Sequence, residues 1–256
     1  CRGAVWIGTA GGGVSRYVDG TFSTFCVAEG LAGESVAAIA EDRQGRLWFG
    51  CCAVEYGHQD GATCYDGEEF LTFTAADGLP DGNVQTIYAD REERLWFGTW
   101  GGGLARYQRG QFAVITEADG LADSSVSAVH QDGEGQLWFG TGIRTGVAGG
   151  GVSCCDLAHF ARFTVAEGLP NNRVISLQED RGGRVWAGTM AGAAWFDGER
   201  FVSAGELPWH VRAIHEDRHG TLWFGTRHKG LHLLQDGRFR PFPGAEDADV
   251  WAILED

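Results

Sequence analysis

The sequence predicts an all-β fold, a six-bladed β-propeller with four-stranded antiparallel blades, and three observations lead to this prediction. Glycine makes up 41 of the 256 residues, and each glycine inside a helix costs about 1 kcal/mol relative to alanine. A Trp-x-Gly motif recurs six times, at spacings of 37 to 48 residues. Short runs of Val, Ile, Phe and Trp between turn residues are typical of β-strands. Four such strands in about 40 residues make one propeller blade.

Each repeat is expected to contain four strands in a fixed order, with the Trp in the second strand. The Trp residues that mark the six repeats are Trp6, Trp48, Trp96, Trp138, Trp186 and Trp223. In the repeat that contains Trp96 the expected elements are a first strand at 84–90, a tight turn at 91–93, a second strand at 95–99, a glycine-rich loop at 101–103, a third strand at 104–108 and a fourth strand at 111–115.

A second motif, Val-x-x-(Ile/Leu/Val)-x-x-Asp, precedes each later Trp, and its last copy ends the chain at 250–256. Each complete repeat has six residues from this Asp to the Trp, and counting from Asp256 on through Cys1 also reaches Trp6 at the sixth residue. We therefore expect residues 250–256 to supply the first strand of the N-terminal blade, which would close the ring and protect a sheet edge. The chain is expected to be a single domain over 1–256, with blades at about 250–256 plus 1–26, 35–74, 83–116, 125–164, 173–203 and 210–242.

The recurring residues are expected to have structural roles. A Trp buries on the order of 200 Å², so the Trp residues should pack blade against blade. The Asp that ends each first strand is followed by x-x-Gly in most repeats, which predicts a turn capped by the Asp side chain. Residues 91–94 lack this glycine, so their turn is expected to differ in shape. The Leu of each Gly-Leu linker should fill the space between blades.

Charge and motif content narrow the classes of function. The formal net charge of −15 argues against nucleic acid or an anionic membrane surface as a partner. No apolar run approaches the roughly 18 to 20 residues of a membrane-spanning helix, so no membrane segment is expected in this chain. The sequence has no nucleophile motif, phosphate loop or dinucleotide fingerprint, and no histidine spacing that matches a zinc signature. We therefore expect no catalytic residue, no metal site and no cofactor.

Two sets of residues on one face of the propeller are candidates for ligand binding. Blade topology places the linkers between blades and the loops between second and third strands on the same face, and two insertions, at 51–60 and 142–150, fall there. Loops on a rigid scaffold are the usual place for function. Cys51, Cys52 and Cys64 flank the first insertion, either as a disulfide that clasps it or as free thiols.

The second set surrounds the mouth of the expected central channel, where the residue type differs in every repeat. Arginine and histidine side chains beside tryptophans there would receive an anionic or sugar-like ligand through charge-assisted hydrogen bonds and ring stacking. The candidate ligand-binding residues are Asn83, Arg173, Trp209, His210, Arg212 and Trp251.

The repeats resemble the two-component regulator propeller repeat over the whole chain. The copy that carries most of the family pattern includes Gly78-Leu79-Pro80, Val84, Ile87, Asp90, Leu95-Trp96-Phe97-Gly98-Thr99, Gly102-Gly103-Leu104, Arg106-Tyr107, Gly110 and Phe112.

The resemblance implies a periplasmic or otherwise extracytoplasmic sensor module of a hybrid histidine kinase, which binds a small molecule or saccharide and signals through dimer geometry. Members of the family commonly carry more repeats than this chain does. Two alternatives are a scaffold for protein partners and a metal-assisted lyase, since virginiamycin B lyase has similar repeats. For the lyase alternative His210 is the one candidate base at the channel mouth.

Overall fold

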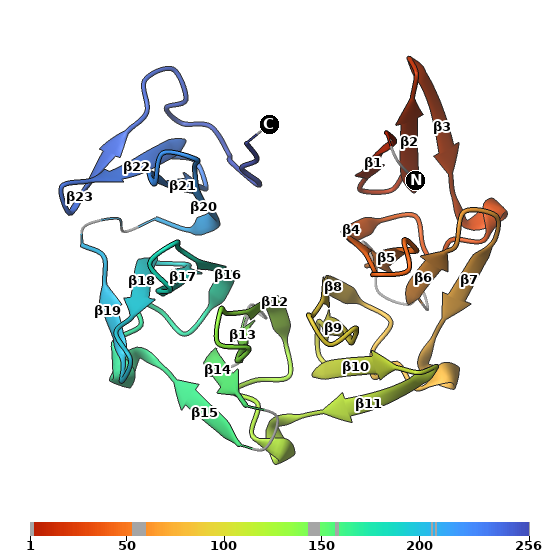
Figure 1. The fold of residues 1–256 in the computed structure, drawn as a ribbon, viewed down its shortest axis with the longest axis horizontal. Helices are drawn as coiled ribbons and strands as arrows, with labels where there is room; N and C mark the ends of the chain where they lie inside the picture. The colour runs from red at the N-terminus through yellow and green to blue at the C-terminus, as the bar shows by residue number, and fades with distance from the viewer. Residues whose placement is uncertain are drawn as a thin grey trace. The chain divides into compact units, whose positions relative to one another are not determined.

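The computed structural model describes residues 3–52, 60–142, 149–156, 159–205, 207 and 209–255. The regular elements among them are β-strands and single-turn 3-10 helices, which confirms the all-β class. The described strands form six antiparallel sheets, five of four strands and one of three (Figure 1). The chain divides into two compact units, the first made of residues 1–118 and 124–126, the second of residues 119–123 and 127–256.

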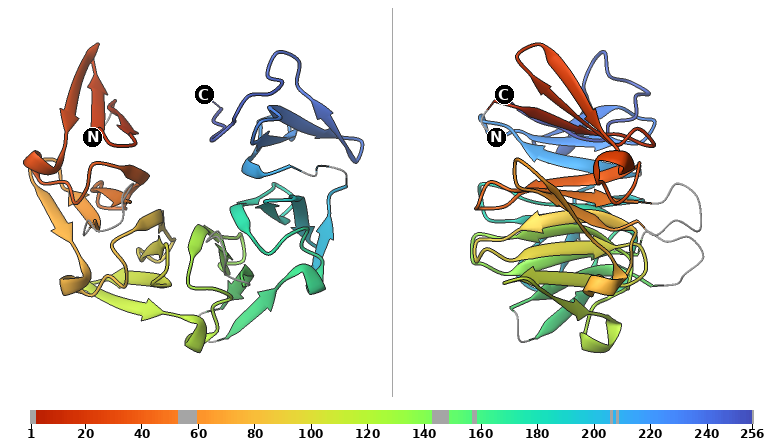
Figure 2. Two further views of the ribbon diagram at one scale, coloured as in Figure 1. Left: turned by 180° about the vertical axis from the view of Figure 1, so that it is seen from behind. Right: turned by 90° about the vertical axis from the view of Figure 1, so that its right-hand side faces the viewer.

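The first unit contains three sheets whose strands lie side by side in sequence order (Figures 1 and 2). The sheets are β1 (Val5–Gly8), β2 (Val14–Val18) and β3 (Thr21–Phe25); β4 (Val36–Glu41), β5 (Leu47–Cys51), β6 (Ala62–Tyr65) and β7 (Phe70–Phe73); and β8 (Val84–Ala89), β9 (Leu95–Thr99), β10 (Leu104–Gln108) and β11 (Gln111–Ile115). The four strands predicted between residues 84 and 115 are therefore confirmed to within one residue.

The second unit contains three four-stranded sheets of the same design, except that Val126, the first residue of β12, is grouped with the first unit. They are β12 (Val126–Gln131), β13 (Leu137–Thr141), β14 (Gly151–Cys155) and β15 (Phe160–Phe163); β16 (Val174–Glu179), β17 (Val185–Thr189), β18 (Gly192–Phe196) and β19 (Phe201–Ser203); and β20 (Val211–Glu216), β21 (Leu222–Thr226), β22 (Leu231–Gln235) and β23 (Arg238–Pro241). We call these sheets blades in chain order, so that the sheet β20–β23 is the sixth blade.

Single-turn helices lead from one blade to the next. They are η1 (Val27–Glu29), η2 (Ala75–Asp77), η3 (Glu117–Asp119) and η4 (Val165–Glu167). In η2, Thr74 and Asp77 cap each other, and Gly78 ends the turn at φ 101°, a left-handed conformation that glycine adopts without strain. The next residue, Leu79, is fully buried. This confirms the expected role of the Gly-Leu linker in filling space between blades.

Within each unit the recurring Trp side chains pack against the next blade, as expected; these are Trp6, Trp48, Trp138 and Trp186. Trp48 of β5 lies with its ring centroid 5.5 Å from that of Phe97 in the next blade, and Trp186 of β17 lies 5.5 Å from Phe224. The glycine of each Trp-x-Gly motif is explained by the same packing. A Cβ added at Gly50 would lie 2.8 Å from a methyl carbon of Val84, so no other residue fits where the next first strand begins.

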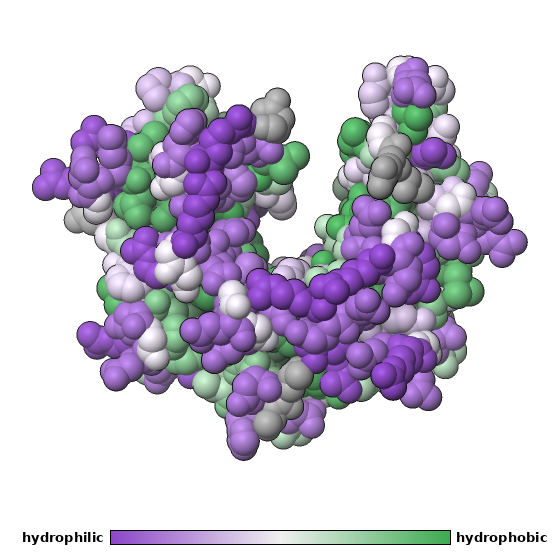
Figure 3. Space-filling model, viewed as in Figure 1, coloured by the Kyte–Doolittle hydropathy of each residue, from purple (hydrophilic) through white to green (hydrophobic). Residues whose placement is uncertain are grey.

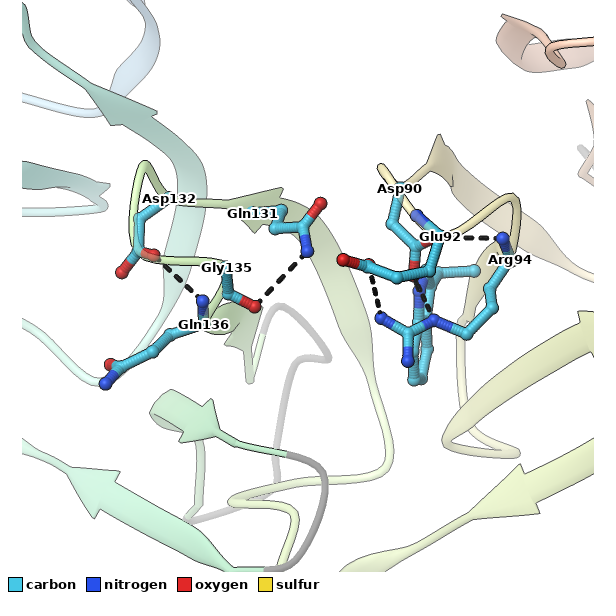
Figure 4. A network of polar contacts seen from close by, with 8 residues as sticks. Asp90, Glu92, Arg94, Gln131, Asp132, Gly135 and Gln136 are labelled. Atoms are coloured by element: carbon cyan, nitrogen blue, oxygen red, sulfur yellow. Dashed lines mark hydrogen bonds and ion pairs between the residues drawn. The ribbon is translucent and has the colours of Figure 1, made fainter.

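The Asp that ends each first strand organises the turn that follows it. Asp90 accepts hydrogen bonds from the backbone N–H groups of Glu92 (3.0 Å) and Arg94 (2.8 Å) and from the indole of Trp96 (2.7 Å). Figure 4 shows this turn in the first unit and, in the second, the equivalent turn in which Asp132 accepts from Gln136. The side-chain cap is thus confirmed, and its bond to the Trp is an addition that the sequence analysis missed.

The turn at residues 91–94 corrects one expectation. It was expected to differ in shape because it lacks glycine. Instead Glu93 adopts the left-handed conformation at φ 62°, close to the φ of 78° of Gly45 in the equivalent turn. The same backbone hydrogen bond also forms, from Glu93 N to Asp90 O. The shape is kept because the Asp cap specifies it, and a non-glycine residue is strained instead.

The C-terminal residues 250–255 form no strand, in contrast to the strand expected at 250–256. They nevertheless begin in the register of a first strand, because Val250 N donates to Thr226 O (3.0 Å) just as Val36 N donates to Thr9 O (2.9 Å). A strand needs a ladder of backbone bonds, and the structure gives this segment one such bond. The first sheet, β1–β3, has three described strands. Pairing between this sheet and residues 250–256 stays a prediction.

Of the two alternatives for the cysteines beside the first insertion, the structure has free thiols at Cys51, Cys52 and Cys64. Burial raises the pKa of Cys51 to about 12 and that of Cys64 to about 11. Within the described residues, no helix combines the length and the apolar character needed to cross a membrane.

Candidate ligand-binding site

A pocket of about 400 Å³ lies at one end of the second unit, lined by Met190, Trp209, His210, Arg227, His228 and Lys229. Antiparallel pairing brings these loops together. Val211, which starts β20, pairs with Thr226, which ends β21, so residues before β20 lie beside residues after β21. Met190 follows β17 at the same end of the preceding blade. This end carries the linkers and the loops between second and third strands, as the sequence predicted for the loop-rich face.

Backbone hydrogen bonds hold the loops that line the pocket. Arg227 N donates to His210 O (3.0 Å), and Met190 N donates to Arg173 O (3.0 Å). The Thr226 hydroxyl donates to the carbonyl of Gly230 (2.8 Å), which closes the loop 227–229. The pocket therefore rests on the ends of regular strands, and its side chains start from defined positions.

The loop 227–229 places three cationic residue types in succession. Arg227 Nε donates to His228 Nε2 (3.0 Å), which accepts through its ring lone pair. The ammonium of Lys229 lies 5.4 Å from the ring centroid of Trp209, within the range of a cation–π contact. Trp209 is 38% exposed. An aromatic ring and positive charge thus share one pocket.

His210 lies within this positive field. Burial lowers its pKa, and the positive charges of Arg227, Arg212 and Arg173 lower it further. At neutral pH the His210 ring is therefore uncharged and offers one donor and one acceptor. It can bind hydroxyl groups, while charge-assisted bonds to a ligand must come from the neighbouring arginine and lysine side chains.

Arg212 and Trp251 form a pair beside the pocket. The guanidinium carbon of Arg212 lies 3.5 Å from the centroid of the Trp251 ring, and its Nη1 lies 3.9 Å from Asp249 Oδ2. The Arg212 side chain is 12% exposed, whereas Trp251 is 70% exposed. Arg212 thus contributes charge from below the surface, and Trp251 covers it.

The structure brings together five of the six residues that the sequence singled out. Trp209 and His210 line the pocket, Arg173 and Arg212 act on His210 through their charge, and Trp251 stacks on Arg212. Asn83 lies in the first unit, where its carbonyl accepts from Trp100 N. Its grouping with the other five stays a prediction.

Arg227, His228, Lys229 and Met190 were missed as pocket residues. A signal was available for three of them: the loop that reads Thr-Trp-Gly-Gly-Gly at 99–103 reads Thr-Arg-His-Lys-Gly at 226–230. Charged residues at positions where other repeats have glycine indicate a local function. The two insertions, at 51–60 and 142–150, lie largely outside the described residues, so the candidate rim is not located.

Two further cavities lie at the opposite ends of the strands, beside the Asp turns. One, of about 900 Å³, is lined by residues of the fourth and fifth blades, including Asp132, Trp138 and Arg184. The other, of about 460 Å³, lies between the second and third blades. Their Asp carboxylates already bind turn N–H groups and indoles, so they serve the turns. Figure 3 shows hydrophilic residues over much of the visible surface of each unit.

Comparison with known proteins identifies the repeat. The family described as Two component regulator propeller matches residues 30–53, 78–101, 120–142, 168–191 and 210–228. The chain carries five copies of this family's repeat. Each matched segment runs from a Gly-Leu linker or the residues before a first strand through the Trp-x-Gly motif, and the last one contains Trp209's neighbour His210 and the loop 227–228. The two component regulator propeller repeat thus includes part of the pocket.

Solved structures with the same fold include two extracellular domains from B. thetaiotaomicron. One belongs to BT3049, described as a hybrid two component system, with 22% identity and a TM-score of 0.57 over 88% of this chain. The other belongs to BT4673, described as a one component system, with 18% identity and a TM-score of 0.65 over 94% of this chain. The chain spans 36% of the length of each domain. These likenesses show a shared propeller fold.

A catalytically inactive virginiamycin B lyase from Staphylococcus aureus with quinupristin also has this fold. It is 11% identical, with a TM-score of 0.60 over 81% of this chain and 70% of the lyase. No curated protein matches the chain. At 11% identity, the comparison with the lyase shows a shared fold alone.

Proposed function

We propose that this chain is a non-catalytic ligand-binding module of a two component regulator, and that it binds a small anionic saccharide in the pocket of the sixth blade. The observation that carries the proposal is the combination of Trp209, His210, Arg227 and Lys229 around one cavity. An exposed indole offers a stacking surface for a sugar ring. Arginine and lysine offer charge-assisted bonds to a carboxylate or sulfate.

The size and charge of the pocket support this ligand class. A volume of about 400 Å³ falls in the range of small-molecule sites, and it accommodates one or two sugar rings. The chain as a whole is acidic, with a net charge of −15. The presence of both Arg227 and Lys229 at the pocket therefore does not follow from the overall composition, and we attribute it to ligand binding. The neutral His210 ring would bind sugar hydroxyls.

The family supports a sensing role outside the cytoplasm. The two solved neighbours from B. thetaiotaomicron are extracellular domains, and we propose the same side of the membrane for this chain. A module of this kind needs no chemistry of its own, because ligand occupancy is the signal. The neighbours' domains are longer than this chain, which spans 36% of each. We place the output part and any dimer contact in other parts of such proteins.

Calorimetric titration with glucuronate, and with glucose as its neutral match, tests the proposal. Arg227→Ala should weaken glucuronate binding at least tenfold, which is the loss of about 1.4 kcal/mol. Arg240→Ala, which removes an exposed arginine from β23 of the same blade, is the matched control and should change nothing. Equal loss in both variants, or capture of a protein partner with no response to any saccharide, would contradict the proposal and favour a scaffold.

A further inference from the structure

His228 connects the pocket to the C-terminal segment, residues 245–255. One of its ring nitrogens, Nε2, accepts from Arg227 on the pocket side. The other, Nδ1, lies 2.9 Å from Asp249 Oδ1. The same carboxylate oxygen accepts the backbone N–H of His228 (2.6 Å). The ring thus stands between a pocket cation and an anion of the C-terminal segment.

The contact with Asp249 is one of a series that seats the C-terminal segment on the sixth blade. Gly230 N donates to Ala248 O (2.9 Å), and Val250 N donates to Thr226 O (3.0 Å). Farther along, the side chain of Arg218 forms an ion pair with Glu255. Two contacts lie directly beside the pocket: the one through His228, and the ion pair of Lys229 Nζ with Asp247 Oδ1 (3.4 Å). Of these two residues His228 is the one whose ring also contacts Arg227, so a change at the ring reaches the segment without an intermediate.

An anion in the pocket changes the state that His228 prefers. Without ligand, the hydrogen bond from Arg227 Nε occupies the lone pair of Nε2. A ligand carboxylate competes for the Arg227 guanidinium and brings a negative charge close to Nε2. Both effects favour a proton on Nε2, because an opposite charge within about 4–6 Å stabilises the charged form.

Charged groups on both sides of the His228 ring act on its protonation, in opposite directions. Lys229 is paired with Asp247 (3.4 Å), and Arg212 Nη1 lies 3.9 Å from Asp249 Oδ2. Arg227 and Lys229 are the cations on the pocket side, beside the uncharged His210, and their positive charges oppose an imidazolium when the pocket is empty. Asp249 faces the ring from the C-terminal segment and favours it. A ligand anion offsets the pocket cations and shifts this balance toward protonation.

Resting on the proposed anionic ligand, we infer that ligand binding converts His228 to an imidazolium that bridges the ligand and Asp249. Binding then takes up a proton from solvent, which attaches to Nε2, while the N–H at Nδ1 stays on Asp249. A charged hydrogen bond is stronger than a neutral one, so the C-terminal segment is held more tightly when the pocket is occupied. Ligand binding and the attachment of residues 245–255 to the sixth blade are therefore coupled. The coupling is reciprocal, so tighter attachment of the segment also strengthens ligand binding.

Two measurements on the whole chain test the inference, with glucuronate as the probe. Titration calorimetry at about pH 7.5 is repeated in buffers of different ionisation enthalpy. We expect uptake of close to one proton per ligand bound. Hydrogen–deuterium exchange of residues 245–255 should slow on addition of glucuronate.

His228→Asn tests the bridge, because Asn tolerates the left-handed backbone at this position (φ 60°) but cannot become charged. It should abolish both the proton uptake and the slowed exchange, even where higher glucuronate concentrations restore occupancy. His219→Asn, in an exposed turn of the same blade, is the control and should keep both.

Glucuronate binding without proton uptake, or with unchanged exchange of 245–255, would overturn this inference and leave the proposed function in place. Absence of glucuronate binding in the unmodified chain would overturn both. Proton uptake that persists in His228→Asn would assign the proton to another group and would also overturn the bridge.

Discussion

The indole Nε1 of Trp96 donates a hydrogen bond of 2.7 Å to Asp90 Oδ2, six residues earlier in the chain, and both side chains are buried. The same pair recurs in the other four blades whose Asp is described, for example as Trp48 with Asp42 at 2.9 Å and Trp186 with Asp180 at 2.8 Å. One carboxylate therefore caps a turn and orients the side chain that packs against the next blade. The turn after the first strand and the Trp in the core are therefore held by the same side chain.

Loss of the Asp should destabilise the fold strongly. Asp90→Ala leaves the Trp96 indole and two turn N–H groups without their acceptor. It also breaks the ion pair of Arg94 Nε with Asp90, while Arg94 Nη2 keeps its ion pair with Glu92. We expect a loss of about 3 kcal/mol in the free energy of unfolding, measured by urea denaturation. Glu68→Ala, in an exposed turn, is the control and should stay within about 0.5 kcal/mol. Similar midpoints for both variants would show that the Asp–Trp pair contributes little.

Glu93→Gly should stabilise the chain. Glu93 is exposed and holds φ at 62°, a conformation that costs a non-glycine residue roughly 1 kcal/mol. The greater freedom of glycine in the unfolded chain offsets part of this strain relief, so we expect a net gain of at most about 0.5 kcal/mol in urea denaturation. Gly45→Ala at the equivalent turn position (φ 78°) should lose a comparable amount. A destabilised Glu93→Gly would mean that the Glu side chain has a contact that outweighs the strain.

The chain should lose stability in acid over a defined window. Burial works against ionisation of Asp42 and Asp180, but hydrogen bonds from the Trp indole and the turn N–H groups outweigh it and lower the pKa of each carboxyl. The bond from Trp223 lowers the pKa of Asp217 to about 2.

Because these pKa values are depressed in the folded state, the stabilisation is complete above the unfolded value, about 3.9, and is lost as the pH falls through the folded values. Thermal midpoints should therefore be nearly constant from about pH 8 to 5, apart from histidine effects, and fall steeply from about pH 4 to 2. Asp217→Asn should flatten the lowest part of this fall. A midpoint that rises on acidification would contradict the assignment.

Much of the fold was predictable because its determinants are local and repeated. The strands between residues 84 and 115 follow from runs of β-forming residues, and the Asp turn follows from an Asp that can bond N–H groups two and four residues on. The conformation of Glu93 was not predictable from composition, because the Asp cap overrides the intrinsic preference of the residue at that position.

The site was predictable in part. Trp209, His210 and Arg212 stand out because their positions differ from the repeat, and pairing of β20 with β21 then brings Arg227, His228 and Lys229 beside them. The contact of His228 with Asp249 joins residues 21 positions apart in loops without a repeat pattern. No local rule specifies such a contact.

Closure of the ring remains a prediction with a specific test. In the first sheet the buried indole nitrogen of Trp6 has no hydrogen-bond partner among the described residues, whereas the other five recurring Trp each bond to the Asp six residues earlier. If residues 250–256 add to this sheet, Asp256 is the equivalent acceptor. Deletion of 250–256 should then speed hydrogen exchange of the β1 amides, while β9 amides stay unchanged. Unchanged exchange in β1 would argue against closure.

The most direct test of the ligand pocket is a titration of the ¹⁵N-labelled tryptophan indoles with glucuronate, followed by NMR. Trp209, which lines the pocket, and Trp251, which stacks on Arg212, should shift in a saturable way. Trp195, which lines the cavity at the opposite end of the strands, should not move. Saturable shifts at Trp195 with Trp209 unmoved would place the binding site elsewhere and contradict the account.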